Sequence, residues 1–114
     1  TIVSNPRDGM LICDVGTKCL GLDQGAHGNN SIKGYGRVKG HPEILVGSLS
    51  EEVGKLYYEG EIDIKVGDKI EIIPNHACSS ANFTNYLITT KNDEVVGAIN
   101  VDIRGNSTLK NVVL

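Results

Sequence analysis

Residues 64–73 read IKVGDKIEII and give the clearest secondary-structure signal in the chain. Gly67 and Asp68 form a turn signal, and the residues after them alternate between charged and apolar side chains. Alternation with a period of two next to a turn predicts a hairpin whose second strand buries one face. The segment therefore indicates β structure near the middle of the chain.

Residue types typical of β-strands and turns also occur over the rest of the sequence. There are 14 Gly residues, aromatic residues make up only 4%, and the apolar residues fall in short runs rich in Val and Ile. Turn signals separate the runs, so we predict strands over residues 1–4, 9–15, 36–39, 44–48, 55–59, 69–73, 86–90 and 94–103. This spacing predicts an all-β fold, a Greek-key barrel of about eight short strands.

Helix is expected in two places at most, each as one short turn. Ser48, Glu51 and Glu52 resemble a capping pattern, but Gly54 follows at once and limits it to a turn. Residues 77–82 could form one helical turn after the strand predicted over residues 69–73. Residues 21–34 carry Gly, Asn, Ser and Asp without periodicity, which predicts a long loop.

The composition is that of one small globular domain. Of 114 residues, 39% are apolar, and 11 basic against 14 acidic side chains leave a net charge of -3. No basic stripe is available to neutralise a phosphate backbone, so nucleic acid is excluded as a partner. No apolar run approaches the roughly 18 residues of a membrane span, and the opening TIVSNPRDG lacks signal-peptide features. We expect no membrane partner and a cytoplasmic location.

The cysteine count and the start of the sequence add two expectations. Three Cys residues, an odd number, disfavour a disulfide framework and favour reduced thiols or metal ligands. The chain begins at Thr1, and its only Met, Met10, falls inside a predicted strand. We therefore expect residues 1–114 to be a single β domain of a longer protein.

The densest chemistry lies at His76 and Cys78, directly after the strand predicted over residues 69–73. A His-x-Cys pair sets an imidazole and a thiol close enough to grip one metal ion, although a closed structural zinc site needs four ligands. Three alternatives stay open. The site is an open metal site, or Cys13 and Cys19 complete four ligands, or Cys78 packs as a small hydrophobe beside a surface His without any metal.

Other polar residues lie at turns. Asp14, Lys18 and Asp23 surround two Gly residues, where the plainer interpretation is a solvated turn with weak local ion pairing. Residues 50–52 form an acidic turn, and an Arg near the end of the last strand has the geometry to pair with a carboxylate in a bidentate manner. The candidate substrate or interface residues are Asp14, Lys18, Asn75, Glu52 and Arg104.

Four phrases follow one another along the chain. An Asp-x-Gly-x-Lys phrase with a further Asp occupies residues 14–23, Leu-Ser-Glu-Glu-Val-Gly occupies 49–54, Pro-Asn-His-Ala-Cys occupies 74–78, and Arg-Gly stands at 104–105. In this order they resemble the C-terminal β domain of the D-serine dehydratase and D-threonine aldolase family, fold-type III pyridoxal phosphate enzymes related to alanine racemase. The resemblance covers nearly the whole chain. Val53 departs from it, because the family usually has His there, and residues 79–81 replace a bulkier run.

The resemblance implies that His76 and Cys78 hold a divalent metal beside a substrate bound to pyridoxal phosphate. A Cys thiolate selects zinc, and members with His-x-Cys are similar to dehydratases, whereas those with His-x-Asp are similar to aldolases. The cofactor and its lysine belong to an N-terminal barrel domain outside this sequence, so no Lys here is assigned to the cofactor. In the family the metal takes the β-hydroxyl of the substrate and makes hydroxide a tolerable leaving group.

From this resemblance we predict the metal-bearing domain of a lyase that removes water from D-serine-like amino acids, with a homodimeric parent. The alternatives are a D-threonine aldolase-like parent, an amino acid racemase-like parent, or a non-catalytic β-barrel binding module. A lipoyl or biotinyl carrier is a further rival, but the only Met, Met10, lies far from any turn with a modifiable Lys. The 114-residue chain alone is predicted to be inactive, since it lacks the cofactor that stabilises an α-carbanion.

Overall fold

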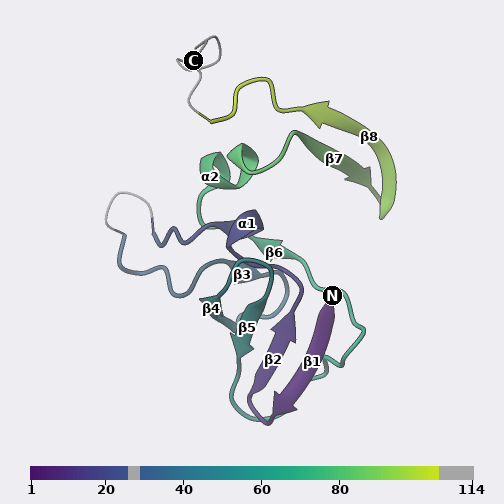
Figure 1. The fold of residues 1–114 in the computed structure, drawn as a ribbon. Helices are drawn as coiled ribbons and strands as arrows, with labels where there is room; N and C mark the ends of the chain where they lie inside the picture. The colour runs from purple at the N-terminus through teal and green to yellow at the C-terminus, as the bar shows by residue number, and fades with distance from the viewer. Residues whose placement is uncertain (26–28, 106–114) are drawn as a thin grey trace.

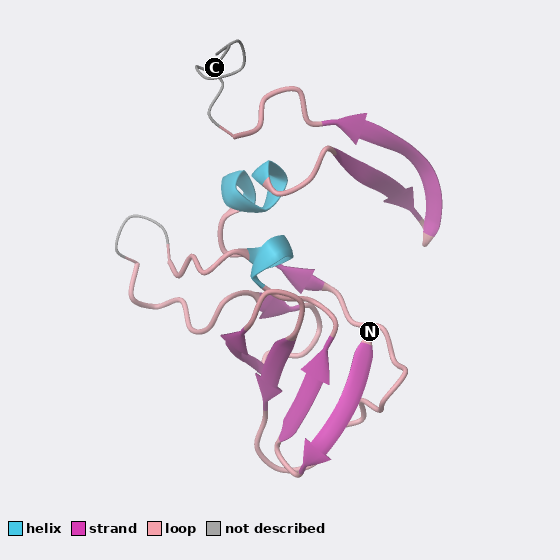
Figure 2. Cartoon of the chain, in the orientation of Figure 1, coloured by secondary structure: helices cyan, strands magenta, loops and turns pink. Residues whose placement is uncertain are grey.

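The computed structural model describes residues 1–25 and 29–105, which form eight strands and two short helices (Figures 1 and 2). Residues 26–28 of the predicted 21–34 loop lie outside the described residues. In chain order the elements are β1 (Ile2–Arg7), β2 (Met10–Cys13), α1 (Thr17–Leu20), β3 (Arg37–Val38), β4 (Leu45–Leu49), β5 (Gly54–Tyr57), β6 (Ile72–Ile73), α2 (Ala77–Asn82), β7 (Tyr86–Lys91) and β8 (Glu94–Asn100).

The largest sheet has four antiparallel strands in the order β1-β2-β5-β4. Its centre is a row of three apolar side chains that face each other across the strands. Leu11 of β2 pairs with Leu56 of β5, which pairs in turn with Val46 of β4, and each of the three is 0% exposed. Burying cross-strand neighbours of this kind is what stabilises a sheet with one covered face.

β3 and β6 form a two-stranded sheet with Val38 opposite Ile72, and Val38 belongs to the same buried cluster as this row. The fully or nearly fully buried apolar side chains of both sheets and their loops form one cluster: Ile2, Leu11, Cys13, Leu20, Val38, Ile44, Val46, Leu56 and Ile64. None of the nine belongs to α2, β7 or β8. The core therefore lies in the first two thirds of the chain.

The third sheet is the β7–β8 hairpin, which lies with α2 at the opposite end of the molecule from β1 and β2 (Figure 1). Asn92 and Asp93 form its turn with φ values of 51° and 63°. Two positive φ values match a two-residue type I′ turn, whose twist suits antiparallel strands. All seven residues of β8 and five of the six in β7 are exposed.

The predicted all-β class and the eight strands are confirmed, as is the helical turn over 77–82. The strands fall in sheets of four, two and two, and no ladder joins them into one closed ring in the part of the chain that the structure describes. β6 is shorter than the predicted 69–73 strand because residues 67–71 bond irregularly to two neighbours. Gly67 and Asp68 bond with Ile2, and the Glu71 carbonyl accepts from Lys39.

Helix α1 was not expected from the sequence, whereas residues 50–53 form only the predicted turn. All three Cys residues are free thiols in the structure. Across residues 1–25 and 29–105, no helix combines the length and the apolar character that crossing a membrane requires.

Candidate functional site

His76 and Cys78 lie where the chain leaves β6 and enters α2. His76 is the N-cap of the helix in an extended conformation (φ -139°, ψ 104°), and Cys78 is the second helical residue. Pro74, which has no N–H to donate, stops the β6 ladder just before this point. The imidazole of His76 is 43% exposed and Cys78 is exposed as well. Both donor groups are thus accessible from outside the chain.

Asn75 anchors this junction to the loop that follows α1. Its side-chain amide donates to the backbone carbonyl of Asp23 at 3.0 Å and to that of Gly34 at 2.9 Å. Both bonds are partly buried and join segments 52 and 41 residues apart in sequence. Asn75 therefore fixes where the two ends of the 21–34 loop lie against the residues before α2.

The loop places the carboxylate of Asp23 beside His76. The Asp23 Oδ2 atom lies 3.6 Å from His76 Nδ1, and the two side chains are 42% and 43% exposed. Gly21 makes the approach possible, because it turns the chain with φ +71° at the end of α1. A Cβ there would also meet the ring of Phe83 at 3.5 Å and Ser79 at 3.8 Å.

The Asp-x-Gly-x-Lys phrase packs on the acidic turn of residues 50–52. Thr17 N–H donates to the Ser50 carbonyl at 2.8 Å, and Lys18 N–H donates to the Glu51 carbonyl at 3.3 Å. These bonds satisfy donors that the start of any helix leaves free. Gly16 lets the two segments touch, since a Cβ there would come within 2.3 Å of the Ser50 oxygen.

The candidate charged residues pair in ways the sequence did not show. Lys18 forms an exposed ion pair with Glu52, and this hydrogen bond raises the pKa of Lys18. The Asp14 carboxylate instead lies 2.6 Å from the backbone nitrogen of Thr1. With Asp23 on His76, the three residues proposed as one cluster thus contact three different partners.

The four-ligand alternative is not formed among the described residues. Cys13 is 1% exposed, and its thiol points to the carbonyls of Gly54 at 3.6 Å and Val15 at 3.8 Å. Cys19 is exposed on α1. Within residues 1–25 and 29–105, no group of three or more His, Cys, Asp or Glu side chains is placed to hold one metal ion.

Arg104 lies against the end of α2. Its Nε donates to the Asn82 carbonyl at 3.3 Å, and its Nη1 donates to the side-chain oxygen of Asn85. The guanidinium is exposed, so part of its fork still faces solvent. In this structure the residue ties the segment after β8 to the segment before β7.

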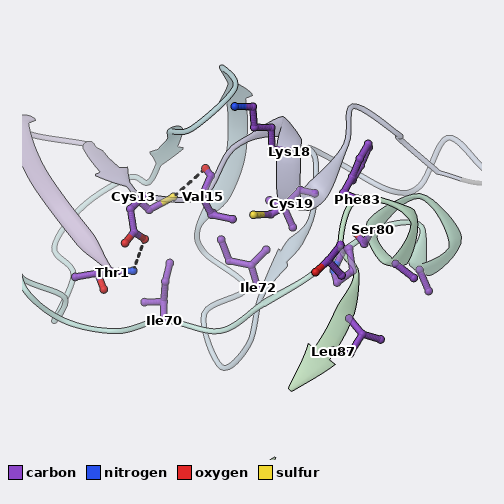
Figure 3. A pocket seen from close by; sticks show the side chains of 16 residues that line it. Thr1, Cys13, Val15, Lys18, Cys19, Ile70, Ile72, Ser80, Phe83 and Leu87 are labelled. Carbon is purple, nitrogen blue, oxygen red and sulfur yellow. Dashed lines mark hydrogen bonds and ion pairs between the residues drawn. The ribbon is translucent and has the colours of Figure 1, made fainter. Parts of the chain in front are cut away.

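A hollow of about 800 Å³ lies between the core sheets and the α2–β7 segment (Figure 3). Its lining is mostly apolar and includes Ile70, Ile72, Phe83 and Leu87. Three residues of α2 line the hollow: Ala77, Ser80 and Ala81. Cys78 is about 100° around the helix axis from Ala77. His76 and Cys78 are not among its lining residues, so the candidate metal pair and the hollow are separate features.

Sequence reasoning missed three elements of this region. These are α1, the double role of Asn75, and Ser80, whose Oγ is buried without a hydrogen-bond partner among the described residues. Gly16 and Gly21, which bracket α1, were the available signal for it. Nothing in the local sequence pointed to the bonds of Asn75, because both partners are more than 40 residues away.

Most of the chain matches one protein-family model. Residues 1–90 match the family model described as "Putative serine dehydratase domain". The chain belongs to this serine dehydratase domain family. The matched range holds the three segments described above, namely the Asp-x-Gly-x-Lys phrase, the acidic turn and the Asn-His-Ala-Cys phrase.

Two relatives of this serine dehydratase-family chain differ greatly in length. It is 30% identical over 108 residues to a D-serine dehydratase of Dictyostelium discoideum, covering 86% of this chain but only 27% of that protein. It is also 27% identical over 112 residues to an uncharacterized protein of Mycobacterium tuberculosis, covering 94% of this chain and 81% of that protein. The domain thus matches about a quarter of one relative and most of another.

Solved structures show the same fold. An alanine racemase-like protein from Idiomarina loihiensis has a TM-score of 0.65 and 30% identity, over 77% of this chain and 26% of that one. D-threo-3-hydroxyaspartate dehydratase from Delftia sp. HT23 has a TM-score of 0.77 and 24% identity, over 92% and 31%. D-threonine aldolase from Filomicrobium marinum has a TM-score of 0.60 and 27% identity, over 76% and 21%.

Proposed function

We propose that this serine dehydratase-family chain is the metal-bearing β domain of a pyridoxal phosphate enzyme that removes water from D-serine or a similar D-β-hydroxy amino acid. The observation that carries the proposal is the exposed pair His76 and Cys78 at the start of α2. The relationship to a D-serine dehydratase supports the substrate class. The three free thiols fit a reducing, cytoplasmic setting.

The donor set of the pair fits zinc. Imidazole nitrogen and thiolate sulfur are preferred zinc ligands, and two protein ligands leave coordination positions for substrate and water. Both side chains are accessible, and no closed four-ligand cage surrounds them in the described residues. When bound, zinc supplies a Lewis acid for the departing hydroxyl group, and pyridoxal phosphate supplies the electron sink for the α-carbanion. The role of this chain is to supply the His76 and Cys78 side chains and to hold them in position for the metal.

The cofactor belongs to a second domain in this proposal. This chain spans only 27% of the D-serine dehydratase relative, which is therefore much longer. None of the Lys residues here is assigned to pyridoxal phosphate, and the isolated chain is therefore expected to release no pyruvate from D-serine. The partners are the D-amino acid and an N-terminal cofactor barrel, and the working enzyme is proposed to be a homodimer.

The β7–β8 hairpin supports packing against such a domain. Leu87 and Ile99 pair on one face, and Leu87 borders the hollow. Ile88 is 60% exposed on the other face, and Val96 of β8 is 62% exposed. A two-stranded hairpin is marginal alone, and a clustered apolar surface of this kind marks an interface. We assign it to the apolar surface of the cofactor domain.

The proposal is tested with His76→Ala and Cys78→Ala in the intact enzyme that carries this chain. We expect both variants to lose bound zinc and most pyruvate release from D-serine while keeping the wild-type far-UV spectrum and unfolding midpoint. His41→Ala and Cys19→Ala are matched controls, since His41 and Cys19 are of the same residue types and lie outside the pair. Full activity of either site variant in the presence of a chelator would refute the metal role.

Assays of the same intact enzyme distinguish two alternative functions, an aldolase and a non-catalytic binding module. The likeness to a D-threonine aldolase, at 27% identity, favours a retro-aldol activity as second candidate. Glycine and an aldehyde from D-threonine would then exceed pyruvate from D-serine. A non-catalytic binding module would hold no zinc in any variant.

A further inference from the structure

We infer that Asp23 is a positioning residue for His76: its carboxylate fixes the imidazole so that Nε2 is the nitrogen presented to the metal. The inference rests on the proposed function and deepens it, because it names a residue that supports the zinc pair without binding substrate. It starts from one distance, the 3.6 Å between Asp23 Oδ2 and His76 Nδ1.

The side of the ring that Asp23 occupies decides which nitrogen is free. A carboxylate beside Nδ1 favours a proton on Nδ1 and leaves the lone pair on Nε2. A histidine that ligates a metal nearly always gives its other ring N–H to a carboxylate, a carbonyl or water, which fixes the tautomer and makes the ligand more basic. In this structure the Asp23 carboxylate lies on the Nδ1 side of the His76 ring, where such a partner belongs, at 3.6 Å, which is just beyond direct hydrogen-bond distance.

The backbone that carries the Asp23 carboxylate is positioned from two sides. From the side of α1, Gly21 turns the chain with φ +71°, and the site of its missing Cβ lies 3.5 Å from Asp23 Oδ2. From the side of β6, the amide of Asn75 holds the Asp23 carbonyl at 3.0 Å. Because Asn75 precedes His76 directly, the backbone that carries the imidazole also holds the residue that orients it.

The geometry assigns a supporting role to Asp23 and not the role of a third ligand. Its nearer oxygen faces Nδ1, and no three-member set of His, Cys, Asp and Glu around a common point exists in the described part of the chain. His76 and Cys78 remain the two donors at the open site. With both partners about two-fifths exposed, the contact is screened by water, so the effect on metal affinity is expected to be moderate.

The test measures zinc affinity of the intact enzyme by competition with a chromogenic chelator, for wild type, Asp23→Ala and Asp23→Asn. Removal of an outer partner of a metal ligand typically costs about 10- to 100-fold in affinity. We expect a loss in this range for Asp23→Ala and a smaller loss for Asp23→Asn, whose amide oxygen keeps an acceptor on the Nδ1 side of the ring. Asp63→Ala, at an exposed position away from the pair, is the control and should match wild type.

A second measurement separates positioning from ligation. With Co²⁺ in place of zinc, Asp23→Ala should keep the sulfur-to-cobalt charge-transfer band of wild type, because Cys78 and His76 still bind. An equal loss of affinity in both Asp23 variants together with a changed cobalt spectrum would make Asp23 a ligand and overturn the inference. Unchanged zinc affinity in Asp23→Ala would overturn it too. A wild-type enzyme that binds no zinc would instead refute the proposed function on which the inference rests.

Discussion

Asn75 and Asp23, 52 residues apart in sequence, are joined by a hydrogen bond of 3.0 Å from the Asn75 amide to the Asp23 carbonyl. The same amide reaches the Gly34 carbonyl at 2.9 Å. One side chain thus ties both ends of the loop after α1 to the residue that precedes His76. The position of the Asp23 carboxylate beside the imidazole depends on this tie.

We predict that Asn75→Ala destabilises the protein by about 1–3 kcal/mol, because two partly buried carbonyls lose their donor. Denaturant unfolding measures the change, with exposed Asn30→Ala as the control. Zinc affinity should fall in parallel, since Asp23 is no longer held. Equal stability of the Asn75 and Asn30 variants would mean that water replaces the amide at no cost.

The centre of the main sheet gives a second prediction. Leu56 is 0% exposed between Leu11 and Val46, so Leu56→Ala removes buried surface and leaves a cavity. A loss of about 2–5 kcal/mol is expected by denaturant unfolding. Leu22→Ala, at a side chain 60% exposed, should change stability by less than about 0.5 kcal/mol. A similar small change at Leu56 would contradict the assignment of the core.

The strands were predictable because their signals are local. Turn residues and short apolar runs located β4 and β7 to within one residue of the predicted 44–48 and 86–90. The turn between the strands predicted over 86–90 and 94–103 was correct for the same reason, since Asn92 and Asp93 tolerate positive φ. The assignment of His76 and Cys78 as a metal pair, made from their spacing and the family resemblance, stays a prediction.

What the sequence did not reveal depends on contacts between distant segments. Helix α1 has only four residues, and the carbonyls of Ser50 and Glu51 satisfy its first N–H groups. The sequence of residues 17–20 does not indicate that carbonyls from a distant turn will accept these hydrogen bonds. The approach of Asp23 to His76 has the same origin, because Asn75 and the turn at Gly21 create it jointly.

The pair His41 and Glu43 gives a prediction about pH. His41 Nδ1 lies 3.0 Å from Glu43 Oε1, and this hydrogen bond, with one from the backbone of Glu43, lowers the pKa of the carboxyl below its ordinary 4.5. Since the pKa is lower in the folded state, the contact contributes stability above pH 4.5 and loses it as the pH falls through the lowered value.

Glu43→Gln should therefore flatten part of the acid-side fall in melting temperature between about pH 6 and pH 3. The change is small, because both groups are largely solvated. Glu61→Gln, at another exposed position, is the control and should keep the wild-type slope. A carbon NMR titration of wild type should place the Glu43 midpoint below 4.5, and a midpoint at or above that value would be inconsistent with the contact.

Ile88→Lys tests the surface assigned to the cofactor domain. Ile88 is 60% exposed in this chain, so the change should leave the unfolding of the 114-residue chain nearly unaltered. In the intact enzyme a buried Lys would be costly, and we expect a lower melting temperature together with faster amide exchange in β7 and β8. Val66→Lys, at a side chain 56% exposed in another part of the fold, should have neither effect. Equal exchange of the hairpin in the isolated chain and in wild-type intact enzyme would contradict the assignment.

Cys78→Asp tests the choice of dehydratase over aldolase. The change keeps an anionic ligand two residues after His76 but replaces a soft sulfur with a hard oxygen, so zinc should bind more weakly relative to Mn²⁺. Water loss needs a strong Lewis acid at the departing hydroxyl, whereas retro-aldol cleavage needs the same oxygen deprotonated and retained, which a harder ion can support. We expect wild type with zinc to release pyruvate and ammonia from D-serine, and the Asp variant to lose that activity by at least about tenfold. Cys19→Asp, at an exposed thiol on α1, is the matched control and should remain active. Parallel assays of glycine from D-threonine decide the outcome, because glycine as the dominant product of wild-type enzyme with zinc bound would replace the dehydratase proposal with the aldolase.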